Sequence, residues 1–212
     1  MLVALPATFA HAALRSPQVP VSGTALQAFF NTQGQAIDVN SAQQDAQRFS
    51  LPAFISFDVH VFGSSDVSSG AYNASVAVPP LYLLSPGAAL NGWFVSVAFR
   101  ESPIRMVVNL FDNNSAFVST VTYLGADRTD LGFYDDGPDG VFYTQDARNP
   151  GGAPKILVFS GTGTGSGSTW FACETGAGAG GDFADHIVLL GFATGPVPTT
   201  TSSWGRVKSL YH

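Results

Sequence analysis

A glycine loop joins two apolar runs in the stretch Phe171-Ala-Cys-Glu-Thr-Gly-Ala-Gly-Ala-Gly-Gly-Asp-Phe-Ala-Asp-His-Ile-Val-Leu-Leu190. Short apolar runs bounded by glycine are typical of strands, and a loop between two of them predicts a β-hairpin. The loop ends in two carboxylates, Asp182 and Asp185, and Glu174 precedes it. Carboxylate oxygens are the ligands that Ca²⁺ prefers. The stretch therefore predicts a hairpin whose end offers three carboxylates to a hard cation.

Short strands separated by turns continue through most of the chain. In the run 53–62, Phe57, Val59 and Val61 fall on one face and polar residues on the other, which is the period of a half-buried strand. Further strand-like runs lie at 93–100, 105–111, 117–124, 131–134, 141–144, 155–160, 168–174 and 186–192. About nine short strands without regular strand–helix alternation predict an all-β fold, an antiparallel β-sandwich or jelly roll.

One short helix is expected before the strands. Leu26, Phe29 and Phe30 recur at helical spacing between residues 24 and 33, and Gly34 follows as a C-cap. The aromatic tail after residue 203 also carries its apolar residues on one side of a helix. We therefore expect a sandwich with a short N-terminal helix and a short C-terminal helical tail.

The ends of the chain differ from its centre. Residues 1–12 are apolar and end in a small-x-small pattern that signal peptidase cuts, so we expect a signal-peptide remnant and a mature start near Ala13. Residues 15–23 hold two prolines and a glycine and are interpreted as a linker. Residues 24–195 are expected to form a single sandwich domain, and 196–212 a linker with the helical tail.

Composition restricts the classes of partner. Lys and Arg total 9 and the net charge is −6, so the clustered basic face that nucleic acid requires is not expected. No run reaches the ~20 apolar residues of a membrane span. The single cysteine, Cys173, excludes an intramolecular disulfide and lies in an apolar run, where an inert buried thiol is expected. Low charge with many neutral turn residues favours a secreted or cell-surface protein.

Catalytic signatures are incomplete. The glycine spacing at 176–181 is followed by a strand, whereas a dinucleotide site needs a helix. Asp58 and His60 share a strand face and lack a third metal ligand, so a solvated face is expected. His186 follows Asp185 and could serve as a ligand or base, but we interpret it as the start of a strand. A Ser-His-Asp triad is defined by spatial geometry, which sequence order does not supply. No enzymatic activity is expected.

A second acidic turn lies upstream. Asp135, Asp136 and Asp139 occur in a Gly/Pro-containing turn with spacing that resembles a calcium loop. Ordinary turn chemistry, in which Asp side chains bond to nearby backbone N–H groups, explains the same residues without a metal. Both interpretations stay open at the sequence level.

Six sequence words carry a family resemblance: Val107-Val-Asn-Leu-Phe-Asp112, Gly132-Phe-Tyr134, Phe142-Tyr-Thr-Gln-Asp-Ala-Arg-Asn-Pro-Gly-Gly152, Trp170-Phe-Ala-Cys-Glu174, Asp182-Phe-Ala-Asp185 and Ser203-Trp-Gly-Arg-Val-Lys208. The turn Asn149-Pro-Gly-Gly152, followed by an apolar strand, is the most specific. From about Ala25 onward the chain resembles a family of secreted bacterial β-sandwich proteins of unknown function. Such domains are found near the C-termini of surface and exosortase-sorted proteins.

The resemblance implies a calcium ligand set at the last hairpin and no established catalytic role. The family's acidic words are only partly kept, because Thr175, Gly180 and Ala184 stand where the family has further donors. Calcium affinity follows the number and charge of the ligands, so the resemblance implies a weak or vestigial site.

Three functional hypotheses follow. We expect a non-enzymatic exported surface, matrix or appendage protein that self-assembles as a homo-oligomer or surface lattice and is stabilised by calcium. The alternative is a carbohydrate-binding sandwich module, which needs exposed aromatic rings to stack on a glycan. A hydrolase is the third hypothesis, and it needs a cleft with a carboxylate or serine constellation.

Overall fold

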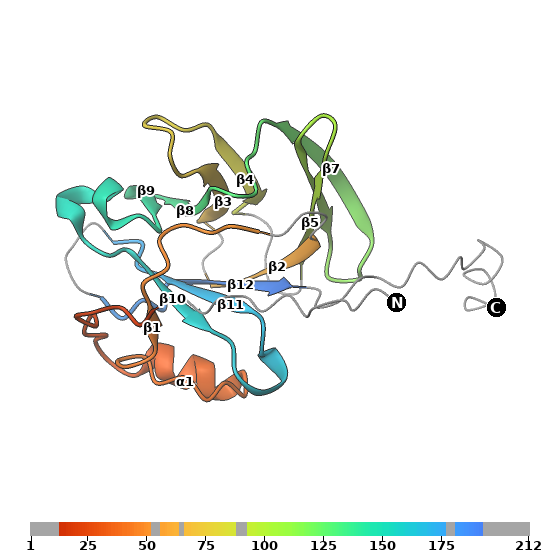
Figure 1. Cartoon of the computed structure of the whole chain (residues 1–212). Helices are drawn as coiled ribbons and strands as arrows, with labels where there is room; N and C mark the ends of the chain where they lie inside the picture. The colour runs from red at the N-terminus through yellow and green to blue at the C-terminus, as the bar shows by residue number, and fades with distance from the viewer. Residues whose placement is uncertain (1–12, 52–55, 64–65, 88–92, 177–180, 193–212) are drawn as a thin grey trace, which may run out of the picture.

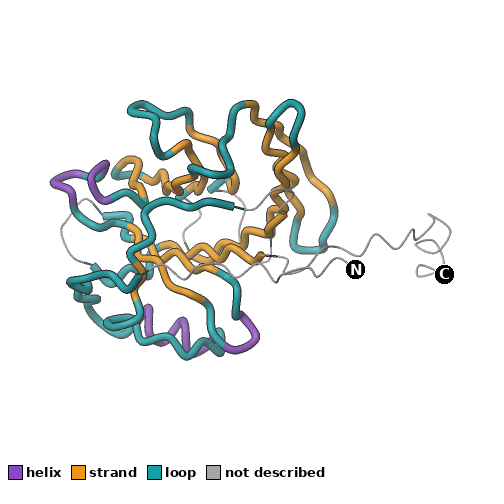
Figure 2. Tube along the Cα trace, viewed as in Figure 1, coloured by secondary structure: helices purple, strands orange, loops and turns teal. Residues whose placement is uncertain are grey.

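Two antiparallel sheets packed face to face make up the protein, so the predicted all-β sandwich is confirmed (Figures 1 and 2). The computed structural model describes residues 13–51, 56–63, 66–87, 93–176 and 181–192. The expected signal segment at 1–12 and the tail at 196–212 lie outside the described residues. No helix in the described ranges is long and apolar enough to cross a membrane.

The large sheet has eight strands in the order β1-β10-β11-β12-β2-β5-β6-β7. Their bounds are β1 Gln43–Gln44, β2 Ser56–Gly63, β5 Phe94–Arg100, β6 Arg105–Phe111, β7 Phe117–Leu124, β10 Ile156–Ser160, β11 Thr169–Cys173 and β12 His186–Phe192. Strands β11 and β12 pair antiparallel with Cys173 opposite His186, which confirms the hairpin predicted from the glycine loop. The alternation in β2 is confirmed as well, because Phe57, Val59 and Val61 are buried.

The small sheet has four strands in the order β4-β3-β8-β9. Their bounds are β3 Ser68–Asn73, β4 Leu81–Ser85, β8 Leu131–Gly137 and β9 Gly140–Tyr143. Strands β3 and β4 were not predicted, since β3 is short, rich in small residues and buried on both faces. At its centre Gly70 lets the Tyr134 ring approach so closely that any Cβ there would overlap the ring.

One boundary prediction was wrong. The run 135–140 was expected to be a turn, but β8 continues through Asp135 and Asp136 to Gly137. Asp135 pairs with Ser69 across the β3–β8 ladder, and this pairing extends the strand into the polar run. The connection to β9 is thereby shortened to Pro138 and Asp139.

Helix α1, Ala25–Thr32, confirms the predicted helix with one residue fewer at each end. Its Leu26 and Phe30 are fully buried against the face of the large sheet that points away from the small sheet (Figure 1). There Phe30 packs edge-to-face on Phe159 and Trp170. The large sheet therefore has one core between the sheets and a second beneath α1. Short 3₁₀ helices lie at Asp146–Arg148, Pro150–Gly152 and Gly163–Gly165.

The segment before α1 is not a free linker, which corrects the interpretation of residues 15–23. Arg15 is buried and its Nη1 lies 2.6 Å from Asp146 Oδ2. The Val19 N–H donates to the Gln43 side chain at 2.8 Å, and Leu14 forms a bridge with Gln44 of β1. This segment therefore covers the β1 edge of the large sheet.

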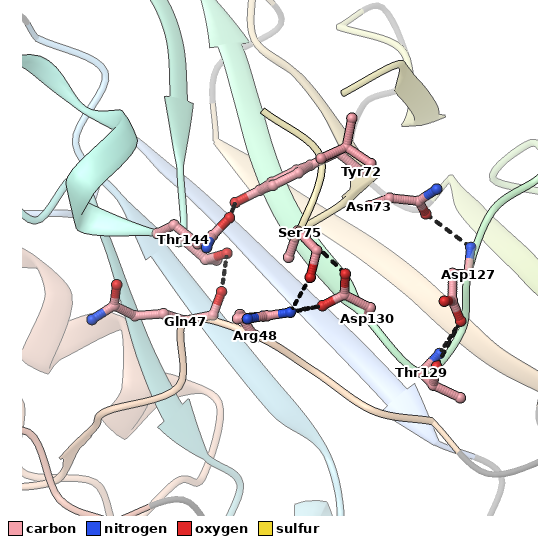
Figure 3. A network of polar contacts seen from close by, with 12 residues as sticks. Gln47, Arg48, Tyr72, Asn73, Ser75, Asp127, Thr129, Asp130 and Thr144 are labelled. Atoms are coloured by element: carbon pink, nitrogen blue, oxygen red, sulfur yellow. Dashed lines mark hydrogen bonds and ion pairs between the residues drawn. The ribbon is translucent and has the colours of Figure 1, made fainter. Parts of the chain in front are cut away.

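A surface network fastens the chain between β1 and β2 to the small sheet (Figure 3). Arg48 pairs with Asp130 and also bonds to Ser75, while the Ser75 N–H donates to Asp130 Oδ2 at 2.8 Å. Burial alone would raise the pKa of Asp130, but the hydrogen bonds from Arg48 and Ser75 outweigh it and lower the pKa. The Thr144 hydroxyl donates to the Gln47 carbonyl at 3.1 Å. We interpret this network as structural: it holds residues 47 and 48 against the small sheet.

Candidate functional site

The structure brings together two of the three carboxylates predicted at the end of the β11–β12 hairpin. Asp185 Oδ2 accepts from the Thr175 N–H at 3.1 Å and from its hydroxyl at 3.0 Å. Burial, and then the neighbouring Asp185, raise the pKa of Glu174. A Cβ at Gly181 would overlap the Glu174 carboxylate, so this close approach requires glycine. Glu174 and Asp185 therefore lie close enough for the charge of one to disfavour the charge of the other.

Asp182, the third predicted ligand, is used within its own turn. Its Oδ1 accepts from the Ala184 N–H at 3.0 Å, the bond of an Asx turn. The intervening Phe183 adopts φ 52° and is buried beneath α1. Among the described residues, no group of three or more His, Cys, Asp or Glu side chains is placed to hold a metal. Calcium at Glu174, Asp182 and Asp185 therefore stays a prediction.

The second acidic set is divided between different environments. Asp135 is buried, whereas Asp136 is exposed, because consecutive residues of β8 point to opposite faces of the small sheet. Asp139 lies in the short connection to β9. The structure thus does not bring Asp135 and Asp136 to one face of the sheet. Two carboxylates on opposite faces do not bind the same ion, so calcium at this turn stays a prediction without support from the geometry of these two residues.

Asp135 instead joins a buried polar cluster composed of Ser69, Asp135, Cys173 and His186, which no pattern in the sequence predicts. All four are at most 5% exposed. The Ser69 hydroxyl lies 2.7 Å from Asp135 Oδ1 and 2.8 Å from His186 Nε2. A hydroxyl has one proton, so the donation to Asp135 leaves Ser69 Oγ to accept from an Nε2–H of His186. The cluster therefore connects the two sheets through the sandwich.

The chemistry of the cluster is that of a closed site. Burial raises the pKa of Asp135, while His186, the Cys173 thiol and Ser69 oppose the shift. Burial, together with Asp135, also raises the pKa of Cys173 well above its ordinary value. The predicted buried thiol is confirmed, and a raised pKa keeps it protonated, which disfavours nucleophilic attack.

The geometry differs from that of a serine hydrolase. In a Ser-His-Asp triad the histidine lies between the serine and the carboxylate. Here Ser69 lies between Asp135 and His186, and the Nε2–Oδ1 distance is 3.9 Å. The adjacent cavity of about 10 Å³ has room for one water molecule at most. We therefore interpret the cluster as a structural connection between the sheets.

A row of aromatic rings crosses the large sheet on the face away from the small sheet. His60, Phe94, Phe111 and Phe117 come from β2, β5, β6 and β7. The rings of Phe94 and Phe111 are inclined by 8° with centroids 4.8 Å apart, so their faces cover each other. A sugar stacks on an exposed ring face. The stacked faces of Phe94 and Phe111 are turned toward each other, so this pair does not support the carbohydrate-binding hypothesis.

Exposed hydrophobic side chains of the described residues gather on strand β7, with the sequence Phe-Val-Ser-Thr-Val-Thr-Tyr-Leu. It is the last strand of the large sheet in the described part of the chain and carries no charge, proline or glycine. Large hydrophobic side chains are exposed along it: Phe117 by 61%, Val118 by 46%, Val121 by 45% and Leu124 by 69%. The sequence pattern of 117–124 predicts this strand but not its position at the edge.

Comparisons of the chain with models of known protein families, with curated proteins and with solved structures found no match.

Proposed function

We propose that this chain is a non-enzymatic structural domain of an exported surface, matrix or appendage protein, and that it associates with further copies of itself. The observation that carries the proposal is the long, uncharged, exposed edge strand β7. An edge strand presents a row of backbone donors and acceptors that another strand can pair with.

Edge strands in monomeric proteins are usually short, charged, interrupted by proline or covered. The opposite edge of the same sheet follows this rule, since β1 has two residues and Leu14 bridges to it. Strand β7 has eight residues, and its register shift against β6 lies only at the start, near Phe117. The contrast supports association at the β7 edge.

The remaining features are consistent with a structural role. The Ser69–His186 cluster is closed to substrates, and the net charge of −6 is spread over a chain with only 11% charged residues. Low charge weakens the electrostatic repulsion between copies. The resemblance to secreted bacterial sandwich domains supports export to the cell surface and calcium binding at Glu174, Asp182 and Asp185.

Light scattering and electron microscopy of the full chain over a wide concentration range test the proposal. We expect association that increases with concentration, and a monodisperse monomer at every concentration would contradict it.

A screen of glycoside, ester and peptide substrates tests the hydrolase hypothesis in parallel. Turnover that is lost in both Ser69→Ala and His186→Ala would show that the buried cluster is catalytic and that the structural function is wrong.

A further inference from the structure

We propose that β7 pairs with the β7 of a second copy, antiparallel and about a two-fold axis at Val121. The two eight-stranded sheets then join into one continuous sheet. This inference rests on the proposed function and makes it specific, because it names the strand, its orientation and its register.

The backbone of β7 determines which residues point away from the sheet. The Gly125 N–H donates to the Ile104 carbonyl at one end of the β6–β7 pair, and the Asp112 N–H donates to the Ala116 carbonyl at the other. Along an antiparallel pair, alternate residues direct their backbone groups at the partner strand. The register shifts between Leu110 and Phe111, so the two ends do not follow one unbroken alternation. Counting back from Gly125 as far as this shift, the residues directed at β6 are Ser119, Val121 and Tyr123. The residues directed away from β6 are Thr120, Thr122 and Leu124, together with Val118, which lies at the shift and has no partner in β6.

This alternation fixes the register. In a two-fold antiparallel pair, a residue on the axis lies opposite its own copy, and residues at equal distances on either side lie opposite each other. The four outward-directed residues are centred on Val121. An axis at Val121 therefore pairs all four of them in hydrogen-bonded positions, whereas any displaced axis leaves some without a partner in β7.

The side chains are complementary in the same register. Val118 lies opposite Leu124 of the second copy, and Val121 lies opposite itself, so three exposed apolar side chains gain apolar neighbours. Thr120 lies opposite Thr122, a cross-strand pair that is favourable in sheets. Since β7 has no charged residue, no like charges face each other along the strand.

The charges at the two ends of the β6–β7 hairpin favour the antiparallel orientation. Arg100 and Arg105 lie opposite each other at the end near Leu124. At this end Glu101 is paired with Arg128, and the exposed Asp127 offsets one of the two remaining arginines, so the end keeps a net positive charge. The acidic Asp112 lies in the turn at the other end. An antiparallel pair brings the acidic end of each copy beside the basic end of the other, whereas a parallel pair would bring like charges together.

The size of the contact predicts a weak dimer. One pair of seven-residue segments buries less than the ~1,600 Å² of a standard stable interface. We therefore expect dissociation in the micromolar range or weaker, on the order of 10⁻⁵ M or above. The experiments below accordingly use concentrated full-length protein.

Single cysteine variants test the register directly, because the native Cys173 is 1% exposed. In Val121→Cys the two sulfur-bearing residues lie opposite each other in a non-hydrogen-bonded pair, where the Cα separation of about 4.5 Å permits a disulfide. The matched control is Ser119→Cys, two residues away on the same strand. Its two copies would be offset by four residues, about 13 Å, which is too far for a disulfide.

Mild oxidation with oxidised glutathione should give at least about tenfold more covalent dimer from Val121→Cys than from Ser119→Cys, since only the first places its thiols in range. Equal yields from the two variants, or no dimer from Val121→Cys, would overturn the proposed register.

A lysine on the axis provides a second, non-covalent test. Val121→Lys places two ammonium groups opposite each other and should weaken association at least about tenfold. The control is Val78→Lys, at a site 89% exposed and outside the edge, which should associate like the wild type. Circular dichroism and melting confirm that both variants fold.

The outcomes separate the two proposals. If the wild type associates but Val121→Lys associates equally well, the β7 pairing is wrong while the structural function stands. A wild type that stays monomeric at millimolar concentration contradicts both.

Discussion

The two edges of the eight-stranded sheet are built in opposite ways. At β1 the edge strand is two residues long, residues 13–23 pack beside it, and α1 covers the adjoining face of the sheet. At β7 the edge strand is eight residues long and exposed almost throughout. Segments that precede the sheet in sequence thus cover one edge and leave the other exposed. The difference indicates that β7 is the surface for association, since coverage is how folded proteins prevent edge pairing.

The two halves of the large sheet, one toward β1 and one toward β7, also differ in the polar contacts that join them to the small sheet. Near the covered edge, β11 and β12 contribute Cys173 and His186 to the buried cluster with Ser69 and Asp135. Near the β7 edge, the Tyr123 hydroxyl donates to the Leu83 carbonyl at 3.0 Å in an exposed position. The covered half therefore has a desolvated polar connection and the β7 half a solvated one.

The largest expected effect is on the packing beneath α1. Phe30→Ala should lower the free energy of unfolding by about 3–5 kcal/mol, because the ring is fully buried against Phe159 and Trp170. Phe117→Ala at the β7 edge should cost under about 1 kcal/mol, because that ring is 61% exposed. Urea titration of both variants measures the difference, and similar costs would mean that the two edges are equally packed.

A smaller effect is expected between the sheets. Ser69→Ala removes the hydroxyl that bridges Asp135 and His186 and should cost about 1–3 kcal/mol, since buried polar groups lose a partner. Tyr123→Phe removes the exposed bond to Leu83 and should cost about 0.5–1 kcal/mol. Thermal melting compares them. A Ser69→Ala variant as stable as the wild type would show that the buried bonds contribute no net stability.

Calcium should stabilise the covered half slightly, through the hairpin end that carries Glu174 and Asp185. A site with millimolar affinity would add about 1 kcal/mol at several millimolar calcium, because binding to the native state shifts unfolding by mass action. Melting in calcium is compared with melting in chelator. Glu174→Gln is the matched control and should show no gain, and identical wild-type curves would rule the site out.

The smallest effect concerns the charge of Glu174 without calcium. Its pKa is raised in the fold by burial and by Asp185, so stability falls as pH rises from the ordinary pKa of a glutamate to the raised pKa in the fold, and the cost is complete above that. Below the ordinary pKa of a glutamate this cost is absent. Glu174→Gln should therefore be more stable than the wild type at pH 7 by a few tenths of a kcal/mol, given the solvent screening of a partly exposed group. At acidic pH this gain should vanish, and a gain independent of pH would show that charge is not its cause.

Local periodicity accounts for what could be predicted of the fold. The strands that became β2, β5, β6, β7, β10, β11 and β12, and helix α1, all carry apolar runs or patterns that a single segment displays. Strand β3 has no such pattern, because both of its faces are buried by neighbours distant in sequence. Only those neighbours make Gly70 a strand residue, through the Tyr134 ring that packs on it.

The sequence by itself determined the fold class, the last hairpin, the helix and the burial of Cys173, because each depends on the hydrophobic pattern of one segment. Tertiary structure alone decided that Ser69 meets Asp135 and His186, which are separated from it by 66 and 117 residues. It also decided that Asp135 and Asp136 face opposite ways and that β7, rather than another strand of the described residues, ends the sheet. The physical reason is that strand order and register arise from pairing between distant segments. The hydrophobic pattern of a single strand does not predict which strand pairs with it.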